Sequence, residues 1–349
     1  MAGIYVHFPF CTSRCIYCDF YSRVRTDYPE YINALIREAE NRRGFLKGVP
    51  PATLYFGGGT PSVLPVRELE RLVSALSVSF DLSRVSEFTV EVNPDDIDSS
   101  KASELRRLGV TRISMGIQSM NDGHLKWMKR RHTAEDAVRA FGTVRDAGFD
   151  NISVDLIFGF EGLSGLEWGR TIRKVMELSP EHVSCYQMMG KYASSDDEAC
   201  LSQYLDLQSV LGEAGYQQYE ISNYCRPGFN SRHNSAYWRR EPYLGLGAAA
   251  HSFDGEVLRC WNVPDTDAYI AGEPLRGETL TDVEVAEEVI MLGLRTSDGI
   301  PKKLVCKNPS YSGFVGSGAL IESGDRVRIS PASFFVSDNI IASLISGDL

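Results

Sequence analysis

Short apolar strands and amphipathic helices alternate six times in the first 214 residues of this 349-residue chain, which leaves few folds open to it. Apolar residues alternate in the strands and recur at helical spacing in the segments between them. The predicted strands are 4–8, 53–56, 88–92, 112–117, 152–157 and 182–186. The predicted helices are 28–43, 66–79, 99–108, 134–147, 165–178 and 201–214. Parallel strands need such crossovers. The pattern predicts an α/β fold, a partial (β/α)6 TIM-like barrel.

The pattern changes after residue 217. Segment 243–251 is small and apolar and predicts a return strand or a tight turn against the barrel. Thr281 and Glu284 have the spacing of a capping box, which predicts a helix that runs to about Leu294. A strand at 326–329 and a helix at 337–344 follow. We therefore expect a barrel domain over residues 1–270 and a small C-terminal α+β domain of winged-helix type over residues 271–349.

Charge and cysteine content narrow the class of protein. The chain has 46 acidic and 36 basic residues, a balance that argues against a nucleic-acid partner. No apolar stretch is long enough for a transmembrane helix, although peripheral membrane contact stays open. The N-terminus lacks a signal-peptide pattern, and five of the eight cysteines are scattered singly. We therefore expect a cytoplasmic protein with reduced thiols.

The other three cysteines crowd one loop directly after the first strand. Cys11, Cys15 and Cys18 follow the spacing C-x3-C-x2-C. Three thiolates can hold three irons of a [4Fe–4S] cubane and leave the fourth iron open to a second ligand. A zinc knuckle or three unrelated thiols are the alternatives, but structural zinc takes four ligands and no fourth cysteine lies nearby. The spacing therefore favours an iron–sulfur cluster.

Polar residues near the ends of the later strands indicate an active-site mouth. Glu91, Gln118 and Asp155 each alternate with apolar neighbours near the C-terminal ends of their strands. In a barrel of parallel strands these ends meet at one face, where active sites lie. The glycines of the segment Gly57-Gly58-Gly59-Thr60-Pro61 allow the backbone to approach a ligand closely.

Together these motifs resemble the radical S-adenosylmethionine superfamily and, within it, the coproporphyrinogen dehydrogenase-like group. The matching segments include Tyr5-x-His7-x-Pro9-Phe10-Cys11, Gly-Gly-Gly-Thr-Pro and Asp155-Leu-Ile-Phe-Gly159. The resemblance implies a cluster on the three cysteines, with S-adenosylmethionine on the open iron. By matched position it implies nucleotide contacts from Tyr5, Tyr17, Gly58, Gly59, Thr60, Glu91, Gln118, Arg130, Asp155, Met189 and His251, of which Met189 and His251 differ in residue type from the dehydrogenase pattern. Lys129 stands where relatives usually carry glycine.

Two features place the chain within this group. The dehydrogenases carry a fourth cysteine two positions after the third, where this chain has Phe20. The haem-chaperone branch has Cys-x-Phe there and also carries His-Asn-x-x-Tyr-Trp, which matches His233, Asn234, Tyr237 and Trp238. Imidazole is a good ligand for haem iron, so His233 is the leading candidate, with the aromatic pair against the porphyrin.

The resemblance thus implies a haem chaperone that binds a [4Fe–4S] cluster, S-adenosylmethionine and haem and delivers haem to an acceptor protein, which the sequence does not identify. Oxygen-independent oxidative decarboxylation of coproporphyrinogen III is the alternative function. Phe20 and the His-Asn-x-x-Tyr-Trp segment favour the first.

Overall fold

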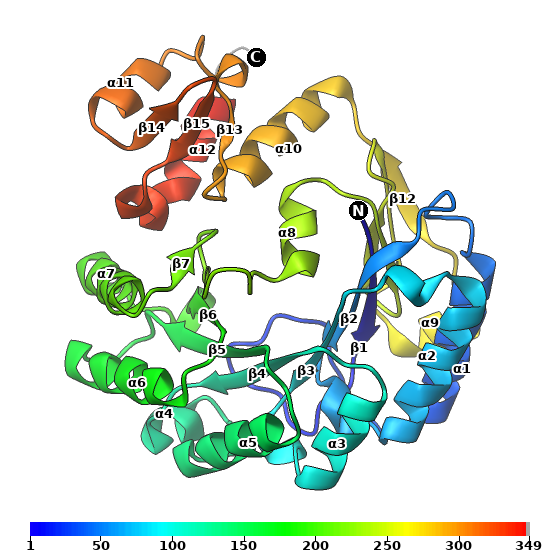
Figure 1. The fold of residues 1–349 in the computed structure, drawn as a ribbon. Coiled ribbons are helices and arrows are strands. Elements are labelled where there is room, and N and C mark those ends of the chain that lie inside the picture. Colours follow the sequence, from blue (N-terminus) through cyan, green and yellow to red (C-terminus); the bar gives the residue numbers. More distant parts are fainter. Residues whose placement is uncertain (347–349) are drawn as a thin grey trace.

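The computed structural model describes residues 1–346 and contains the six predicted strand–helix units. The parallel strands are β1 (Ala2–Phe8), β2 (Pro51–Gly58), β3 (Glu87–Val92), β4 (Arg112–Gln118), β5 (Ile152–Phe158) and β6 (His182–Gln187). The helices after them are α1 (Tyr28–Asn41), α2 (Val66–Ser79), α3 (Ser99–Arg107), α5 (Ala134–Asp146), α6 (Gly165–Leu178) and α7 (Asp197–Glu213), and they cover the outside of the curved sheet (Figure 1). The predicted partial barrel is confirmed.

Later segments extend this sheet at both edges. Strand β9 (Tyr243–Leu246) pairs in parallel with β1, so the expected return strand is present. Three antiparallel strands follow at that edge: β10 (His251–Phe253), β11 (Leu258–Trp261) and β12 (Arg276–Thr279). At the other edge, β8 (Asn223–Cys225) pairs with β6, and β7 (Gln217–Gln218) pairs with β8. Because β12 pairs with β11, residues 276–279 belong to the large sheet rather than to the C-terminal unit.

The C-terminal unit is a small α+β structure. It contains α10 (Asp282–Leu294), β13 (Ile300–Pro301), α11 (Tyr311–Gly316), β14 (Leu320–Ser323), β15 (Arg326–Ile329) and α12 (Ser337–Ile345). The three strands form an antiparallel sheet in the order β13-β15-β14. Helices α10 and α12 pack on each other beside this sheet (Figure 1). The Thr281 hydroxyl and the Glu284 carboxylate form the predicted capping box of α10. The winged-helix comparison stays a prediction.

The apolar core lies between the sheet and the outer helices. Outward-facing residues of the strands, such as Ile4, Phe56, Val90 and Met115, are buried in it. The inward-facing residues that alternate with them are mostly polar. They are Tyr5 and His7 on β1, Thr53 and Tyr55 on β2, Glu87, Thr89 and Glu91 on β3, Arg112 and Ser114 on β4, Ser153 and Asp155 on β5, and His182 and Ser184 on β6. A TIM barrel normally fills this space with branched apolar side chains, so the polar lining indicates a ligand-binding interior.

One end of the barrel is closed by a short helix that the sequence pattern did not reveal. Helix α8 (Arg232–Trp238) lies in the middle of the ring of strands (Figure 1). The Glu87 carboxylate, near the start of β3, accepts hydrogen bonds from the backbone N–H groups of Arg232 and His233 at 2.9 and 3.0 Å. A carboxylate at a helix N-terminus satisfies otherwise unpaired N–H groups. Glu87 therefore ties α8 to the barrel floor.

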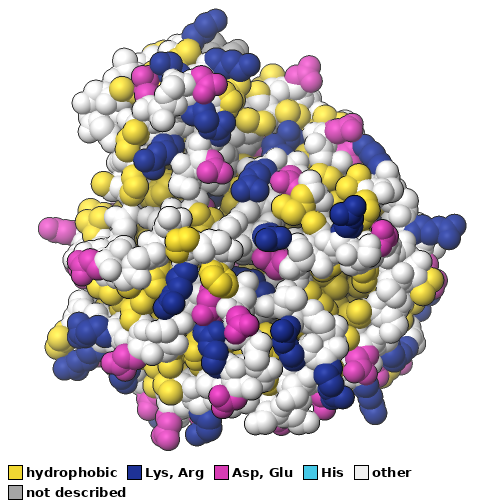
Figure 2. All heavy atoms as spheres, viewed as in Figure 1, with side chains coloured by type: hydrophobic (Ala, Val, Ile, Leu, Met, Phe, Trp, Pro, Cys, Tyr) yellow, Lys and Arg dark blue, Asp and Glu magenta, His cyan; other side chains and the backbone are white. Residues whose placement is uncertain are grey.

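None of the helices in residues 1–346 combines the length and the apolarity that a membrane crossing requires. Basic and acidic side chains are interspersed on the face of the molecule shown in Figure 2.

Candidate functional site: a cavity between the cysteine loop and the barrel strands

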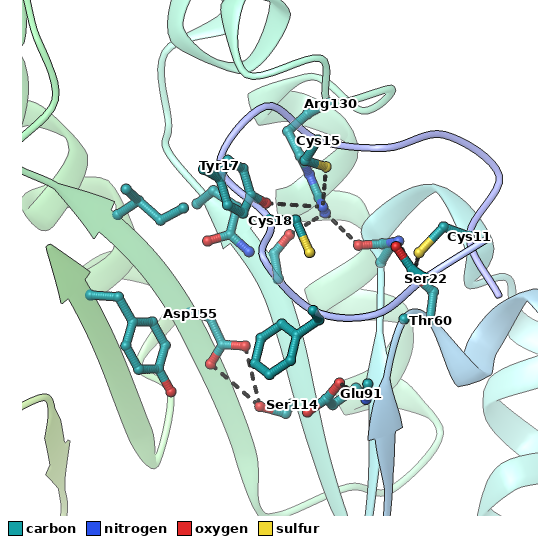
Figure 3. A pocket seen from close by; sticks show the side chains of 18 of the residues that line it. Cys11, Cys15, Tyr17, Cys18, Ser22, Thr60, Glu91, Ser114, Arg130 and Asp155 are labelled. Carbon is teal, nitrogen blue, oxygen red and sulfur yellow. Dashed lines mark hydrogen bonds between the residues drawn. The ribbon is translucent and has the colours of Figure 1, made fainter. Parts of the chain in front are cut away.

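A cavity of about 540 Å³ opens at the C-terminal ends of the barrel strands. The loop with the three cysteines lies on one side of it, and Glu91, Ser114 and Asp155 lie on the strand side (Figure 3). Of the residues expected to contact the nucleotide, nine form its wall: Tyr17, Gly58, Gly59, Thr60, Glu91, Gln118, Arg130, Asp155 and Met189. Residues from seven separate segments therefore converge on the site that the motifs predict.

The cysteine loop is held in place by the first strand and by Arg130. Cys11, Cys15 and Cys18 are partly exposed and line the cavity. The His7 ring is hydrogen-bonded at Nε2 to the Tyr21 carbonyl oxygen on the far side of the loop (2.9 Å) and at Nδ1 to the Tyr5 hydroxyl (3.0 Å). Burial lowers the pKa of His7 to about 4, so the ring is neutral. The neutral ring therefore braces the loop without adding charge.

The donor set of this loop suits an iron–sulfur cluster. Within residues 1–346 no three His, Cys, Asp or Glu side chains stand close enough together to hold a single metal ion. A cubane needs no such convergence, because each thiolate binds a different iron. Burial raises the pKa of Cys11 and of Cys18, so binding of the irons would release protons from these thiols. The three thiols therefore fit a cluster better than a mononuclear zinc site.

Arg130 connects the loop to the strands. Its Nη1 donates to the Cys15 sulfur (3.6 Å) and to the Tyr17 hydroxyl (3.4 Å). Its Nη2 donates to the Gly116 carbonyl oxygen (2.6 Å) and to the Asn93 side-chain oxygen. The preceding Lys129 has φ of 60°, in the left-handed region that costs a non-glycine residue about 1–2 kcal/mol. This conformation explains why glycine is usual at that position.

Two carboxylates face the cavity from the strand side. Glu91 accepts hydrogen bonds from the Tyr55 hydroxyl (2.8 Å) and from the Gly58 N–H (3.0 Å). Asp155 accepts one from the Ser114 hydroxyl (3.3 Å). Burial raises the pKa of Glu91 to about 7 and also raises the pKa of Asp155. The ionisation of both groups therefore depends on the charges that surround them.

A bulge in β4 directs Gln118 into the site. The pairing of β4 with β5 shifts register between Gly116 and Gln118, and Gln118 has φ of 68°. Bulges next to active sites commonly re-aim a side chain in this way. A Cβ atom at Gly116 would lie 2.8 Å from Gln118 Nε2, so a larger residue there would displace the Gln118 side chain.

Two of the expected nucleotide contacts are not at this cavity wall. Tyr5 lies deeper in the barrel, beside the rings of Tyr55 and His233. His251 is an exposed residue on β10, where its ring stacks on Trp261. Contact between either residue and the nucleotide stays a prediction. The cavity is also lined by Tyr55, Arg112 and Ser114, which belong to no motif in the sequence, although alternation along their strands marks them as inward-facing.

The four residues predicted to bind haem lie on α8 but face different surroundings. His233 is 2% exposed, with Nδ1 hydrogen-bonded to the Thr53 hydroxyl and Nε2 to the Tyr237 hydroxyl, both at 2.8 Å. Asn234 lines the same cavity as Glu91. Trp238 lines a second cavity, of about 550 Å³, beside the C-terminal unit. In this arrangement neither nitrogen of His233 is free to bind iron.

The similarity of this chain to known proteins agrees with a radical SAM site at the cysteine loop and the strand ends. Residues 5–175 match the model of the radical SAM superfamily. The heme chaperone HemW of Bacillus subtilis is 35% identical over 325 residues, which cover 87% of this chain and 86% of that protein. The HemW of Lactococcus lactis is 31% identical over 376 residues, which cover 99% and 97% of the two chains. This chain belongs to the HemW family of the radical SAM superfamily.

Membership in this superfamily implies a [4Fe–4S] cluster and S-adenosylmethionine. A solved structure of coproporphyrinogen III oxidase (HemN) from Escherichia coli matches with a TM-score of 0.84 over 99% of this chain and 90% of that one. Its sequence is 21% identical, so the likeness shows the shared fold alone.

Proposed function

We propose that this chain is a haem chaperone that holds a [4Fe–4S] cluster on Cys11, Cys15 and Cys18, binds S-adenosylmethionine and passes haem to an acceptor protein. The observation that carries the proposal is identity of 30% or more to HemW proteins along most of the chain, together with the cavity that unites the expected cluster and nucleotide residues. The exposed Phe20, in place of a fourth cysteine, favours this role over decarboxylation of coproporphyrinogen III. The eight cysteines form no disulfide, in keeping with the cytoplasmic location that we propose.

We propose that Glu91 and Asp155 bind the positively charged part of S-adenosylmethionine from the strand side of the cavity. Two further polar residues line the same cavity, namely Gln118 at the end of β4 and Arg130 in the segment before α5. When bound, the cluster would act as the electron donor to the sulfonium. The protein supplies the closed, polar surroundings in which a charge interaction is stronger than in water.

The nucleotide role of Glu91 predicts a large loss of affinity in Glu91→Gln. The amide keeps the shape of the side chain but removes the charge, and a hydrogen bond to a charged group contributes about 1.5–3 kcal/mol. We expect the dissociation constant for S-adenosylmethionine, measured anaerobically by calorimetry on the reconstituted protein, to rise at least about tenfold. Glu181→Gln is the matched control, because that carboxylate is buried outside the cavity and pairs with Arg145. Equal affinities in the two variants would rule out this role.

For haem, we propose that α8 provides the ligand and that His233 binds iron only after its hydrogen bond to Tyr237 is broken. Burial lowers the pKa of His233 to about 3, so the imidazole is neutral, the form that binds iron. The bond between Nε2 and the Tyr237 hydroxyl competes with iron for the same nitrogen. Access to His233 therefore requires α8 to move on its contacts with the barrel floor.

This proposal predicts opposite effects of two substitutions on haem binding. His233→Ala should shift the Soret band and weaken haem binding about tenfold or more, whereas Tyr237→Phe should strengthen binding, because Nε2 is released and the ring is kept. Absorbance titrations with haem measure both effects. His251→Ala, on the exposed strand β10, is the control and should match the unmodified protein. If the Soret band of His233→Ala is unchanged, another residue binds the iron.

A further inference from the structure

Arg112 is a buried cation with unpartnered guanidinium nitrogens in the described part of the chain. It is the first residue of β4 and is 1% exposed. Its Nε and Nη1 atoms have no hydrogen-bond partner among residues 1–346. A buried charge without direct partners is costly. A side chain of this kind at the wall of the nucleotide cavity therefore calls for a functional explanation.

Arg112 lies on the strand between those that carry the two carboxylates of the site. Strand β4 lies between β3, which carries Glu91, and β5, which carries Asp155. Arg112 pairs in register with Thr89, whereas Ser114, two residues further along β4, pairs with Glu91. Arg112 thus lies one inward-facing layer below Ser114, whose hydroxyl donates to Asp155. All of these residues except Thr89 line the same cavity.

The groups around Arg112 leave it as the main positive charge of the barrel floor. The ionisable side chains that interact with its charge from the surrounding elements are Tyr55, Glu87, Glu91, Asp155, His182, Tyr219, Cys225 and His233. Burial lowers the pKa of both histidines and raises the pKa of the tyrosines, so these groups are neutral. Arg130 is the other cation, but it is bonded at the mouth of the cavity to Cys15, Tyr17 and Gly116.

The three carboxylates take all their hydrogen bonds from neutral donors. Glu87 accepts from two backbone N–H groups, Glu91 from Tyr55 and Gly58, and Asp155 from Ser114. Three negative charges in an enclosed space disfavour one another, and burial disfavours each of them. Arg112 is the only unbonded cation in the described part of the barrel floor that can oppose this effect through space.

We propose that Arg112 is a positioning residue whose charge keeps Glu91 and Asp155 ionised, so that they can bind the positively charged nucleotide. The inference rests on the proposed function, because S-adenosylmethionine carries the sulfonium charge that ionised carboxylates would stabilise. Arg112 forms no direct ion pair with Glu91 or Asp155 in the described residues. A bidentate ion pair would occupy the carboxylate oxygens that the ligand needs. Burial raises the pKa of Glu91 to about 7, so a loss of the nearby cation matters at neutral pH.

The test is the pH dependence of S-adenosylmethionine binding, measured by anaerobic calorimetry on the cluster-loaded protein from about pH 5.5 to 9. In the unmodified protein, affinity should rise with pH as Glu91 and Asp155 ionise. In Arg112→Gln the midpoint of that rise should lie about one pH unit higher, with affinity about tenfold weaker at pH 7 and largely recovered at high pH. Arg112→Lys keeps the charge and should restore the original midpoint. The titration of the ligand itself is common to all variants.

A second variant predicts the opposite shift. Glu87→Gln removes a carboxylate that faces Arg112 from below the site, and with it the repulsion that this negative charge exerts on Glu91 and Asp155. Its midpoint should lie below that of the unmodified protein. This variant keeps an oxygen that can accept from the N–H groups of α8. It can overturn the inference even if Arg112→Gln does not fold, because an unchanged midpoint would show that charges on the barrel floor do not control the ionisation of Glu91 and Asp155.

The outcomes separate the inference from the proposed function. If the unmodified protein does not bind S-adenosylmethionine, both are overturned. If it binds, and Arg112→Gln is weaker by the same factor at every pH, Arg112 has only a structural role and the inference alone is overturned. An unchanged midpoint in Glu87→Gln would have the same meaning.

Discussion

Replacing any one of Cys11, Cys15 and Cys18 by alanine is expected to remove the iron–sulfur absorbance and to reduce bound iron from about four atoms per chain to nearly none. All three thiols lie on one loop and line one cavity, and no neighbouring thiol is available as a substitute ligand. Anaerobic reconstitution, followed by iron and sulfide analysis and an absorbance spectrum, measures the effect.

Cys306→Ala is the matched control for that experiment. Cys306 is exposed and lies in the C-terminal unit, so it reports general thiol loss and adventitious iron. Its spectrum should equal that of the unmodified protein. The cluster assignment fails if a variant that lacks all three loop cysteines still takes up a full complement of iron.

Gly58→Ala is expected to abolish S-adenosylmethionine binding and to weaken cluster retention. Gly58 has φ of 104°, which an L-residue adopts at a cost of roughly 1–2 kcal/mol. A Cβ atom there would lie 2.4 Å from the Nδ1 atom of His7. The ring would have to move, although it braces the cysteine loop through the Tyr21 carbonyl. The substitution would also disturb the hydrogen bond that the Gly58 N–H donates to the Glu91 carboxylate.

Gly109→Ala separates the steric effect from backbone strain. Gly109 has φ of 94°, but a Cβ atom there would meet nothing within 4 Å. Both variants should melt at a lower temperature than the unmodified protein, by a few degrees for the strain alone. Only Gly58→Ala should also lose nucleotide affinity and iron. Equal loss of affinity in both variants would contradict the proposed role of the contact between Gly58 and His7.

Much of the barrel was predictable because its signals are local. The start of β4 at Arg112 and the start of β6 at His182 agree with the predicted strands, since apolar alternation marks a half-buried strand without knowledge of its partner. Helix α6 was equally predictable, and its predicted limits at Gly165 and Leu178 match the structure. The spacing of Cys11, Cys15 and Cys18 likewise needs no tertiary information, because one short loop carries all three thiols.

The sequence by itself thus determined the six strand–helix units, the cysteine loop and the polar strand ends that face one cavity. Only the tertiary structure decided what surrounds each buried polar group. His233 reads as an available haem ligand until α8 docks and Thr53, 180 residues away in the chain, occupies its Nδ1 atom. In the sequence Arg112 looks like an ordinary charged residue, and only the pairing of β4 with β3 and β5 shows that it is buried. The physical reason is that strand and helix periodicity depends on neighbours in sequence, whereas the protonation and availability of a buried group depend on charges and donors from distant segments.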